Sequence, residues 1–479
     1  MMRRMLNAYS RKLGCSIAWT IFLLGCCIAV PQAGYGRDYL VTDYGAKADG
    51  LTLDTKAVQA AIDRCHGDGG GTVIVPAGHT VLIGTIYLKD FVALRVEMGG
   101  VLLGSNNIAD YATDTHKTMY KDEPHMNRCL IFAQSAKHIA IKGNGTIDGN
   151  GFFKNFTAKT GRPMLIRFLA CEDIRVNDIT LINPASWTSS WLYCNRITVS
   201  GIKIVSRVNN NGDGLDFDGC SDVRVTNSSF DTSDDSICLQ TSQPDKPCRN
   251  IVISNCTFTS KWAGIRIGLL SRGDFESVAV SNCTFTDISD SGLKIQMNEG
   301  GEMKNMIFSN LIMKNVPRPV FMTFCQQRAY VDAPVEMPPM KAMHHFNFNN
   351  FIVDNRELDQ NAGFVFTGMP GHTIDHITLS NIQFVVAGGG TEEEANRAEI
   401  NELTLPVLGN WWPEFKLLGT LPAFGIYARH VKGLYASDIQ VQTIAADRRM
   451  AVVLDDVSMA TFSNSYANGR PITPKIINK

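Results

Sequence analysis

The chain has 479 residues, with 45 Lys and Arg against 46 Asp and Glu, 44% hydrophobic residues and 13 cysteines. The near-zero net charge and the lack of a basic run exclude a typical nucleic-acid-binding protein, because phosphate contacts need a positive patch. The apolar fraction excludes a disordered chain. Length alone would suggest about three domains, although one repetitive architecture could absorb the same number of residues.

The first 33 residues predict an export signal. They begin with basic residues and continue as an apolar stretch from Ile17 to Val30, which is short for a membrane span. Cleavage could follow Ala29 or Ala33, but Leu23 to Cys26 also resembles a bacterial lipobox, which predicts cleavage before Cys26 and a lipid anchor on it. A lone membrane anchor is the remaining alternative. We therefore expect an exported protein that is periplasmic, an outer-membrane lipoprotein or secreted.

The next predicted element is a short helix over residues 55–65. Its apolar residues fall on one face, and Asp54 before it is a candidate cap. Such a helix could cover the open end of a repetitive sheet, because terminal repeats must hide an exposed edge. We predict one domain over residues 37–479, with insertions around 325–345 and 385–420.

A repeated phrase then runs along the chain. Each copy has apolar residues at its fourth, sixth, ninth and eleventh positions, which predicts two strands separated by a bend. The first six copies open at residues 171, 194, 220, 248, 275 and 303, in steps of 23 to 28 residues. This spacing is the coil length of a right-handed parallel β-helix, an all-β solenoid in which like positions stack about 4.8 Å apart.

Four copies of the phrase open with cysteine. Export would normally make the mature cysteines candidates for disulfides. In stacked coils they would instead form a column of small apolar groups, which is the interpretation we favour. The four are Cys171, Cys194, Cys220 and Cys248. No cysteine spacing predicts a metal site.

Acidic residues recur on adjacent predicted coils. The apolar pairs Leu215/Phe217, Ile237/Leu239, Ile265/Ile267 and Leu293/Ile295 put four segments in register, at separations of 22, 28 and 28 residues. This register brings Asp213, Asp234 and Asp235 together before the first two pairs. Strand parity points Asp216, Cys238, Arg266 and Lys294 outward from the middle of the pairs. Asp213 and Asp235 reach the same face only if the chain turns there, as their Asn, Gly and Ser neighbours indicate.

Carboxylates on adjacent coils can hydrolyse a glycosidic bond. One protonated acid serves the leaving oxygen, and a base activates water. Mutual repulsion helps to keep a proton on one member of such a cluster. Taken singly, each Asp is more often a turn residue, so the shared register carries the functional prediction. Trp262, beside Asp234 in the register, is a packing residue or a platform for a sugar ring; we assign the lone histidines no role.

These residues closely resemble glycoside hydrolase family 28, the polygalacturonase family of pectin-degrading β-helix enzymes. The similarity covers nearly the whole mature chain, including VTDYGAKADGLTLDTKAVQAAID near its start and GMPGHTIDHITLSNI near its end, and it looks like the bacterial branch. The family's Asn-Thr-Asp motif is matched by Asn211-Gly212-Asp213 and its Asp-Asp pair by Asp234-Asp235. The resemblance implies an inverting reaction, with Asp234 as general acid and with Asp213 and Asp235 activating water.

Two family motifs are altered. The Gly-His-Gly motif falls on Trp262-Ala263-Gly264, without its histidine, and the Arg-Ile-Lys motif falls on Lys294-Ile295-Gln296. We expect Arg266 to replace the lost positive charge through bidentate carboxylate binding. The predicted substrate-binding residues are Arg266, Lys294, Asn211, Asp216, Trp262 and Gln296.

The sequence thus predicts an exported hydrolase of galacturonic-acid-containing pectin, either homogalacturonan or a branched pectin such as rhamnogalacturonan. We expect a monomer without cofactor or metal, whose partner is a pectic polysaccharide or oligosaccharide and not nucleic acid. Two alternatives remain open. One is a polysaccharide lyase or uronate epimerase that binds Ca²⁺ through the acids; the other is a non-catalytic carbohydrate-binding solenoid.

Overall fold

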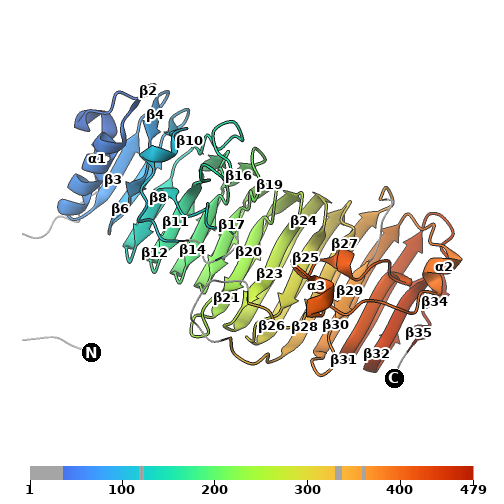
Figure 1. The fold of residues 1–479 in the computed structure, drawn as a ribbon. Helices are drawn as coiled ribbons and strands as arrows, with labels where there is room; N and C mark the ends of the chain where they lie inside the picture. The colour runs from blue at the N-terminus through green and yellow to red at the C-terminus, as the bar shows by residue number, and fades with distance from the viewer. Residues whose placement is uncertain (1–35, 118–119, 121–122, 330–336, 359–362, 478–479) are drawn as a thin grey trace, which may run out of the picture. The chain divides into compact units, whose positions relative to one another are not determined.

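The computed structural model describes residues 36–117, 120, 123–329, 337–358 and 363–477. The predicted export signal, with Cys26, lies outside these residues. The described strands form a single hydrogen-bonded sheet of 35 strands. Their pairing is parallel except between β33 (Tyr466–Ala467) and β34 (Arg470–Pro471). Each strand pairs with its counterpart one coil later, so the predicted parallel β-helix is confirmed (Figure 1).

The strands stack in three lines along the coils. The first line holds β1 (Arg37–Leu40), β3 (Gly71–Val75), β6 (Val92–Val96), β9 (Lys137–Lys142), β12 (Glu172–Asn177), β15 (Asn195–Ser200), β18 (Ser221–Thr226), β21 (Cys248–Ser254), β24 (Phe275–Ile288), β26 (Met303–Lys314), β28 (Met343–Asn355), β30 (Ile374–Val386) and β31 (Ala423–Thr443). The second line holds β2 (Asp49–Leu53), β4 (Thr80–Ile83), β7 (Val101–Gly104), β10 (Thr146–Asp148), β13 (Thr180–Ile182), β16 (Lys203–Ser206), β19 (Ser229–Thr232) and β22 (Thr257–Ser260), and joins the first line at β24. The third line holds β5 (Ile86–Tyr87), β8 (Cys129–Gln134), β11 (Met164–Leu169), β14 (Ser189–Leu192), β17 (Leu215–Asp218), β20 (Ile237–Thr241), β23 (Ala263–Ser271), β25 (Ser291–Met297), β27 (Arg318–Phe324), β29 (Phe364–Thr367), part of β31, β32 (Met450–Ser463) and β35 (Lys475–Ile476).

The third line has the register that the apolar pairs predict. Leu215 pairs with Ile237, Ile237 with Ile265, and Ile265 with Leu293. All four side chains are buried in the core of the solenoid. The residues between the apolar pairs align in the same way and point out of the core: Asp216, Cys238, Arg266 and Lys294.

The bend inside the repeated phrase is made by asparagine in the left-handed backbone region. Asn282, Asn310, Asn350 and Asn381 have φ of 54°, 56°, 58° and 52°. Asparagine tolerates this conformation better than most residues. Each of the last three donates its side-chain amide to the preceding asparagine, at 2.9, 2.6 and 3.0 Å. The ladder therefore fixes the bends of successive coils against one another.

The cysteines form the predicted column. The ten cysteines of the described residues are all free and buried. The backbone N–H of Cys171 donates to the sulfur of Cys194 at 3.4 Å, and the thiol of Cys220 donates to the carbonyl of Trp191 at 3.2 Å. Burial in the core, not cross-linking, therefore accounts for these cysteines.

Helix α1 (Thr55–Gly67) covers the first coils, as predicted. Val58, Ala61 and Ile62 are buried against the first strands. Asp54 does not cap this helix through its side chain, contrary to our expectation. Its carboxylate instead accepts hydrogen bonds from the backbone N–H groups of Lys47 and Ala48, each at 2.8 Å. It therefore stabilises the loop that leads into the helix.

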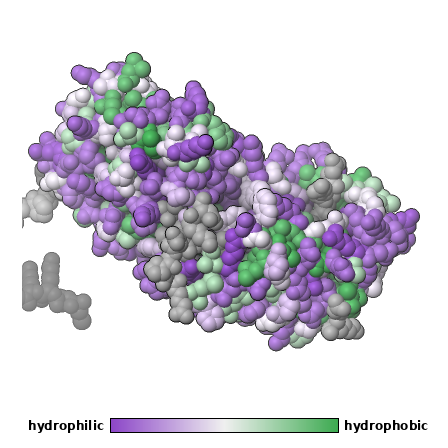
Figure 2. All heavy atoms as spheres, viewed as in Figure 1, coloured by the Kyte–Doolittle hydropathy of each residue, from purple (hydrophilic) through white to green (hydrophobic). Residues whose placement is uncertain are grey.

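The predicted late insertion lies between β30 and β31. It contains α2 (Glu392–Ala395), α3 (Leu405–Leu408) and a short 3-10 helix, η3 (Phe415–Leu417). Leu403, Leu408, Leu418 and Leu421 of the insertion pack on outward residues of the third line, such as Phe321. Hydrophobic residues gather over α3 on the face that Figure 2 shows. The insertion thus covers the outer face of the third line next to the acidic coils.

Among the described helices, none has the length and apolar character that a membrane span needs.

Candidate active site

The three predicted catalytic aspartates lie together at the start of two neighbouring strands. Asp213 precedes β17, and Asp234 and Asp235 precede β20. One carboxyl oxygen of each lies within 4.8 Å of the others. They line a pocket of about 170 Å³. Asp213 and Asp235 are buried, whereas Asp234 is only half-buried, which makes it the most accessible of the three to a bound sugar.

The backbone turns where the sequence predicts it must. The N–H of Gly214 donates to the carbonyl of Asp235 at 3.0 Å, so the two turns stack directly. A Cβ at Gly212 would lie 2.4 Å from the carbonyl oxygen of Ser206, and one at Gly214 would lie 2.2 Å from that of Ser236. Glycine is therefore required at both positions to bring Asp213 beside its partners.

The acidic cluster retains protons. Burial, followed by repulsion from Asp235, raises the pKa of Asp234 to about 8. Burial, followed by repulsion from Asp234, also raises the pKa of Asp213 well above its ordinary value. The protons belong to the coupled group more than to a single residue. A carboxylic acid that is still protonated near neutral pH can donate its proton to a leaving group.

Asp235 has the opposite surroundings, because Arg266 neutralises it. The Nη1 of Arg266 lies 3.0 Å from Oδ2 of Asp235, and the backbone N–H of Ala263 donates to Oδ1 at 3.1 Å. The other edge of the guanidinium donates twice to Oε1 of Gln296, at 3.1 and 2.8 Å. Both edges are engaged within the protein, so the structure corrects our expectation of a bidentate substrate-carboxylate site on Arg266.

Lys294 and Gln296 are covered by the late insertion. Lys294 is fully buried; its ammonium donates to Glu414, lies 3.1 Å from Asp290 and sits 4.9 Å from the centre of the Trp262 ring. Gln296 is also fully buried and donates its amide to the carbonyl of Pro413 at 2.6 Å. Neither lines the aspartate pocket, which corrects their predicted contact with substrate. Both point out of the core as predicted, but the insertion lies over them.

Burial and ion pairing have opposite effects on the pKa values of Lys294 and Arg266. Burial alone would lower the pKa of Lys294, but the carboxylates of Asp290 and Glu414 outweigh it and raise that pKa. Burial would likewise lower the pKa of Arg266, which Asp235 and Glu414 raise instead. Both side chains therefore stay cationic in the folded protein.

Asn211 and Asp216 have different surroundings from each other. Asn211 lines the aspartate pocket, and it accepts a hydrogen bond from Arg162 at 2.7 Å and donates one to Glu123 at 3.3 Å.

Asp216 is 2% exposed, and neither of its carboxyl oxygens has a hydrogen-bond partner. Burial and repulsion from Asp235 raise its pKa well above the ordinary value. Asp216 does not line this pocket but lines a smaller neighbouring one that shares Tyr120 and Trp187 with it, so its contact with substrate stays a prediction.

Aromatic residues surround the acids. Trp262 lines the pocket as predicted, together with Tyr120, Trp187 and Trp412. The Tyr120 ring meets the rings of both Trp187 and Trp412 edge to face, at 5.6 and 5.7 Å. Sequence reasoning missed Tyr120, Glu123, Trp412 and Glu414 because they lie in loops outside the repeated phrases. The only signal for Trp412 and Glu414 was the predicted insertion around 385–420, whereas Tyr120 and Glu123 lie outside both predicted insertions.

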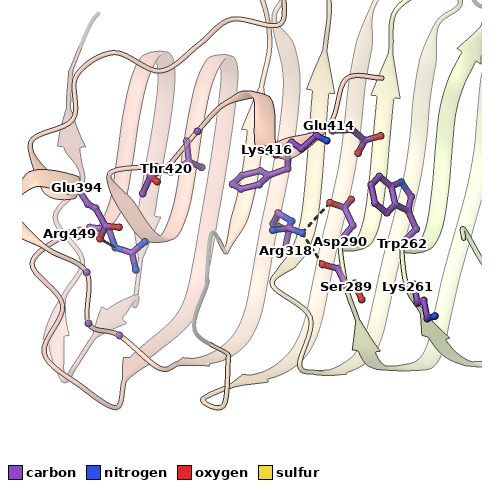
Figure 3. A pocket seen from close by; sticks show the side chains of 16 residues that line it. Lys261, Trp262, Ser289, Asp290, Arg318, Glu394, Glu414, Lys416, Thr420 and Arg449 are labelled. Atoms are coloured by element: carbon purple, nitrogen blue, oxygen red, sulfur yellow. Dashed lines mark hydrogen bonds and ion pairs between the residues drawn. The ribbon is translucent and has the colours of Figure 1, made fainter. Parts of the chain in front are cut away.

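A second, larger pocket shares Trp262 with the aspartate pocket, and Figure 3 shows the side chains that line it. It has a volume of about 540 Å³, and Trp262 and Glu414 both line it. One of its basic residues, Arg318, lies 3.1 Å from Asp290 and stacks on Phe415 at 4.7 Å. The other basic residues that line it are Lys261, Lys416 and Arg449. The shared tryptophan makes the two pockets neighbours along one face.

The arrangement contains the groups needed for hydrolysis of a glycosidic bond. Asp234 is an accessible carboxyl that retains its proton near neutral pH. Asp235 is an ion-paired carboxylate less than 4.8 Å away that could orient a water molecule. The tryptophans and Tyr120 offer apolar faces for sugar rings.

Comparison with known proteins gives consistent results. Residues 72–341 match the model for glycosyl hydrolases family 28. A probable polygalacturonase of Vitis vinifera is 26% identical, with 72% of this chain and 74% of that protein aligned. An exo-poly-alpha-D-galacturonosidase of Dickeya chrysanthemi is also 26% identical, with 76% of this chain and 70% of that protein aligned. Among solved structures, an exopolygalacturonase from Thermotoga maritima superposes with a TM-score of 0.63 at 20% identity, covering 73% of this chain and 87% of that one.

Proposed function

Because this chain belongs to glycosyl hydrolase family 28, we propose that it cleaves α-glycosidic bonds of galacturonic-acid-containing pectin. The observation that carries the proposal is the cluster of Asp213, Asp234 and Asp235 in an aromatic pocket, where Arg266 pairs with Asp235 and the pKa of Asp234 is raised to about 8. The relatives named as polygalacturonases support the substrate class. Homogalacturonan and rhamnogalacturonan are both pectic backbones of this class.

The roles follow from accessibility and charge. Asp234, half-buried and protonated, donates its proton to the leaving oxygen. Asp235 and Asp213 hold the attacking water between them, with Arg266 keeping the charge of Asp235 balanced. Asn211, fixed by Arg162, and the ring of Trp262 orient the sugar. The second pocket holds a further unit of the same polysaccharide, where the exposed Lys261 and Lys416 can face uronate groups.

The test is the release of reducing sugar from a panel of pectic fractions. Asp234→Asn should lower the rate by about 10²- to 10⁴-fold, the usual contribution of a general acid, without loss of the fold by circular dichroism. Asp245→Asn, which changes an exposed aspartate outside both pockets, is the matched control. Wild-type rates in Asp234→Asn would disprove the assignment.

Family membership argues against the two alternatives. A lyase would release an unsaturated, ultraviolet-absorbing product, and a chelator would abolish its activity. A non-catalytic solenoid would bind pectin without turnover, and Asp213→Asn would not weaken the binding. The hydrolase should instead release saturated products in the presence of EDTA.

We further propose that the protein is exported and acts as a monomer. Export is supported by the basic and apolar pattern of residues 1–33. A lipid on Cys26 would place the mature protein in the membrane fraction, and Cys26→Ala would release it.

A further inference from the structure

The aspartate pocket has an unusual charge balance for a site that handles an acidic polysaccharide. Four of its lining residues are acids, namely Glu123, Asp213, Asp234 and Asp235. Among the residues that the structure describes, its one lining cation is Arg266, which is already paired with Asp235 and Gln296. A uronate carboxylate placed here would face these acids, and the described lining residues offer it no uncommitted cation. Burying an unpaired charge is costly, whereas a neutral sugar carries no such penalty.

Lys294 could have balanced the charge of a uronate, but it already forms an ion pair with Glu414 of the protein itself. Lys294 points out of the core on the coil after Arg266 and is fully buried under Glu414. Glu414 is 3% exposed, and its second oxygen lies 4.0 Å from Nη2 of Arg266. That oxygen has no hydrogen-bond partner. One carboxylate from the insertion therefore faces both cations, as the carboxylate of a bound sugar would.

The rest of the pocket suits an uncharged ring. Trp187, Trp262 and Trp412 supply apolar faces around the acids, and such faces stack on the C–H surface of neutral sugars. The larger pocket, which shares Trp262, is lined by Asp290, Glu394 and Glu414 as well as by basic residues, and its two arginines are paired with Asp290 and Asp447. Its exposed lysines, Lys261 and Lys416, can face acidic units of the same polymer that lie next to the catalytic pocket without entering it.

We infer that Glu414 is a specificity-determining residue that replaces a substrate carboxylate, so that the sugar unit bound among the catalytic aspartates is uncharged. The inference rests on the proposed hydrolysis of pectin and names the kind of unit beside the cleaved bond. Substrates would be pectic chains in which neutral units alternate with, or interrupt, galacturonate. Fully acidic homogalacturonan would be a poor substrate.

The experiment compares polymers that differ in charge. The purified enzyme is incubated with polygalacturonate, with the same polymer after partial reduction of its carboxyl groups to CH₂OH, and with an alternating rhamnose–galacturonate backbone. Initial rates are measured, and mass spectrometry identifies the units at the new chain ends. For wild type we expect rates at least about tenfold higher on a neutral-containing polymer than on polygalacturonate, with a neutral unit at one new end.

Variants of Glu414 test its role directly. Glu414→Gln keeps the shape and removes the charge, and Glu414→Ala opens a space of carboxylate size beside Lys294 and Arg266. Both should gain cleavage of polygalacturonate relative to the neutral-containing polymers, and acetate should inhibit this new activity only in Glu414→Ala. Glu393→Gln, an exposed acid of α2, is the control and should behave as wild type.

The outcomes separate the inference from the proposed function. Efficient wild-type cleavage of polygalacturonate with acidic units at both new ends would overturn the inference and leave the hydrolase intact. An unchanged charge preference in folded Glu414→Gln would overturn the role of Glu414. Failure to cleave any of the three polymers would overturn the proposed function, and the inference with it. If Glu414→Ala does not fold, the sugar units at the new chain ends produced by the wild-type enzyme still show whether the unit beside the cleaved bond is neutral or acidic.

Discussion

Asp234 combines accessibility with a pKa of about 8, and these two properties together predict the pH dependence of catalysis. A general acid works only while it is protonated. kcat/KM should therefore fall as the pH rises through about 8. The measurement is kcat/KM on a soluble pectic oligosaccharide between pH 4 and 10. A rate that keeps rising from pH 6 to 9 would contradict Asp234 as the acid.

The same residue makes the folded protein less stable at higher pH. The carboxyl has a pKa near 4 when unfolded and about 8 when folded, so the folded state binds more protons between these values. Its contribution to stability is complete below pH 4 and is lost as the pH rises through 8. Asp234→Asn removes this loss, so its Tm should match wild type at pH 4 and exceed it by a few °C at pH 8. Calorimetry at both pH values checks this, and an equal pH dependence in the two proteins would refute it.

The surroundings of Asp213 and Asp235 also predict the stereochemistry. Carboxyl oxygens within 4.8 Å are closer than the pair in most inverting glycosidases. Neither residue is suited to attack carbon itself, because Asp235 is 1% exposed with both oxygens bonded, and Asp213 has a raised pKa. A water held between them should attack instead, which inverts the anomeric configuration. Early products should therefore carry the β-anomer, as seen by proton NMR; initial α-anomer would indicate a covalent intermediate.

Within the coils, the strands are held together by stacked core side chains. Phe258 of β22 lies between Phe230 and Phe285, with ring centres 5.1 and 4.8 Å apart. Phe258→Ala should cost about 3–5 kcal/mol, because it loses apolar burial and leaves a cavity between two coils. Ile312→Ala is the matched control, because Ile312 is 51% exposed on β26, and it should change stability by less than about 0.5 kcal/mol. Thermal unfolding of both variants checks this, and similar Tm values would contradict the role of the stack.

Strands and coils could be predicted because they repeat. The alternation of apolar residues fixed which face of each strand is buried, and the apolar pairs gave the register that aligns Asp216, Cys238, Arg266 and Lys294. The repeats make the strand register unambiguous, because a shift of one residue in the pairing would turn all the buried apolar side chains of a strand toward solvent. The clustering of Asp213, Asp234 and Asp235 could be predicted for the same reason.

Loops carry no such constraint, and the errors of prediction lie there. Lys294 was expected in contact with substrate because strand parity points it outward, and Gln296 because it falls on a family motif, yet Glu414 and Pro413 cover them. These partners are more than a hundred residues away in the sequence. No local pattern states where an insertion docks, because docking depends on three-dimensional packing. Glu414, whose carboxylate pairs with the cations at the site, thus lies in the insertion, where the sequence has no repeated pattern.

Across the whole molecule, a solenoid must protect the ends of its sheet. Helix α1 covers the first coils with Val58, Ala61 and Ile62, and an uncovered end would be free to pair with another chain. Ile62→Asp puts a charge into this fully buried contact and should loosen the helix.

For this variant we expect dimers or larger aggregates by size exclusion with light scattering, whereas wild type and the exposed control Lys56→Asp should be monomers. The monomeric fraction of Ile62→Asp should keep its kcat/KM, because the proposed catalytic aspartates directly precede β17 and β20, several coils beyond the strands that α1 contacts. An Ile62→Asp protein that is monomeric with an unchanged Tm would show that the end of the sheet does not depend on this helix.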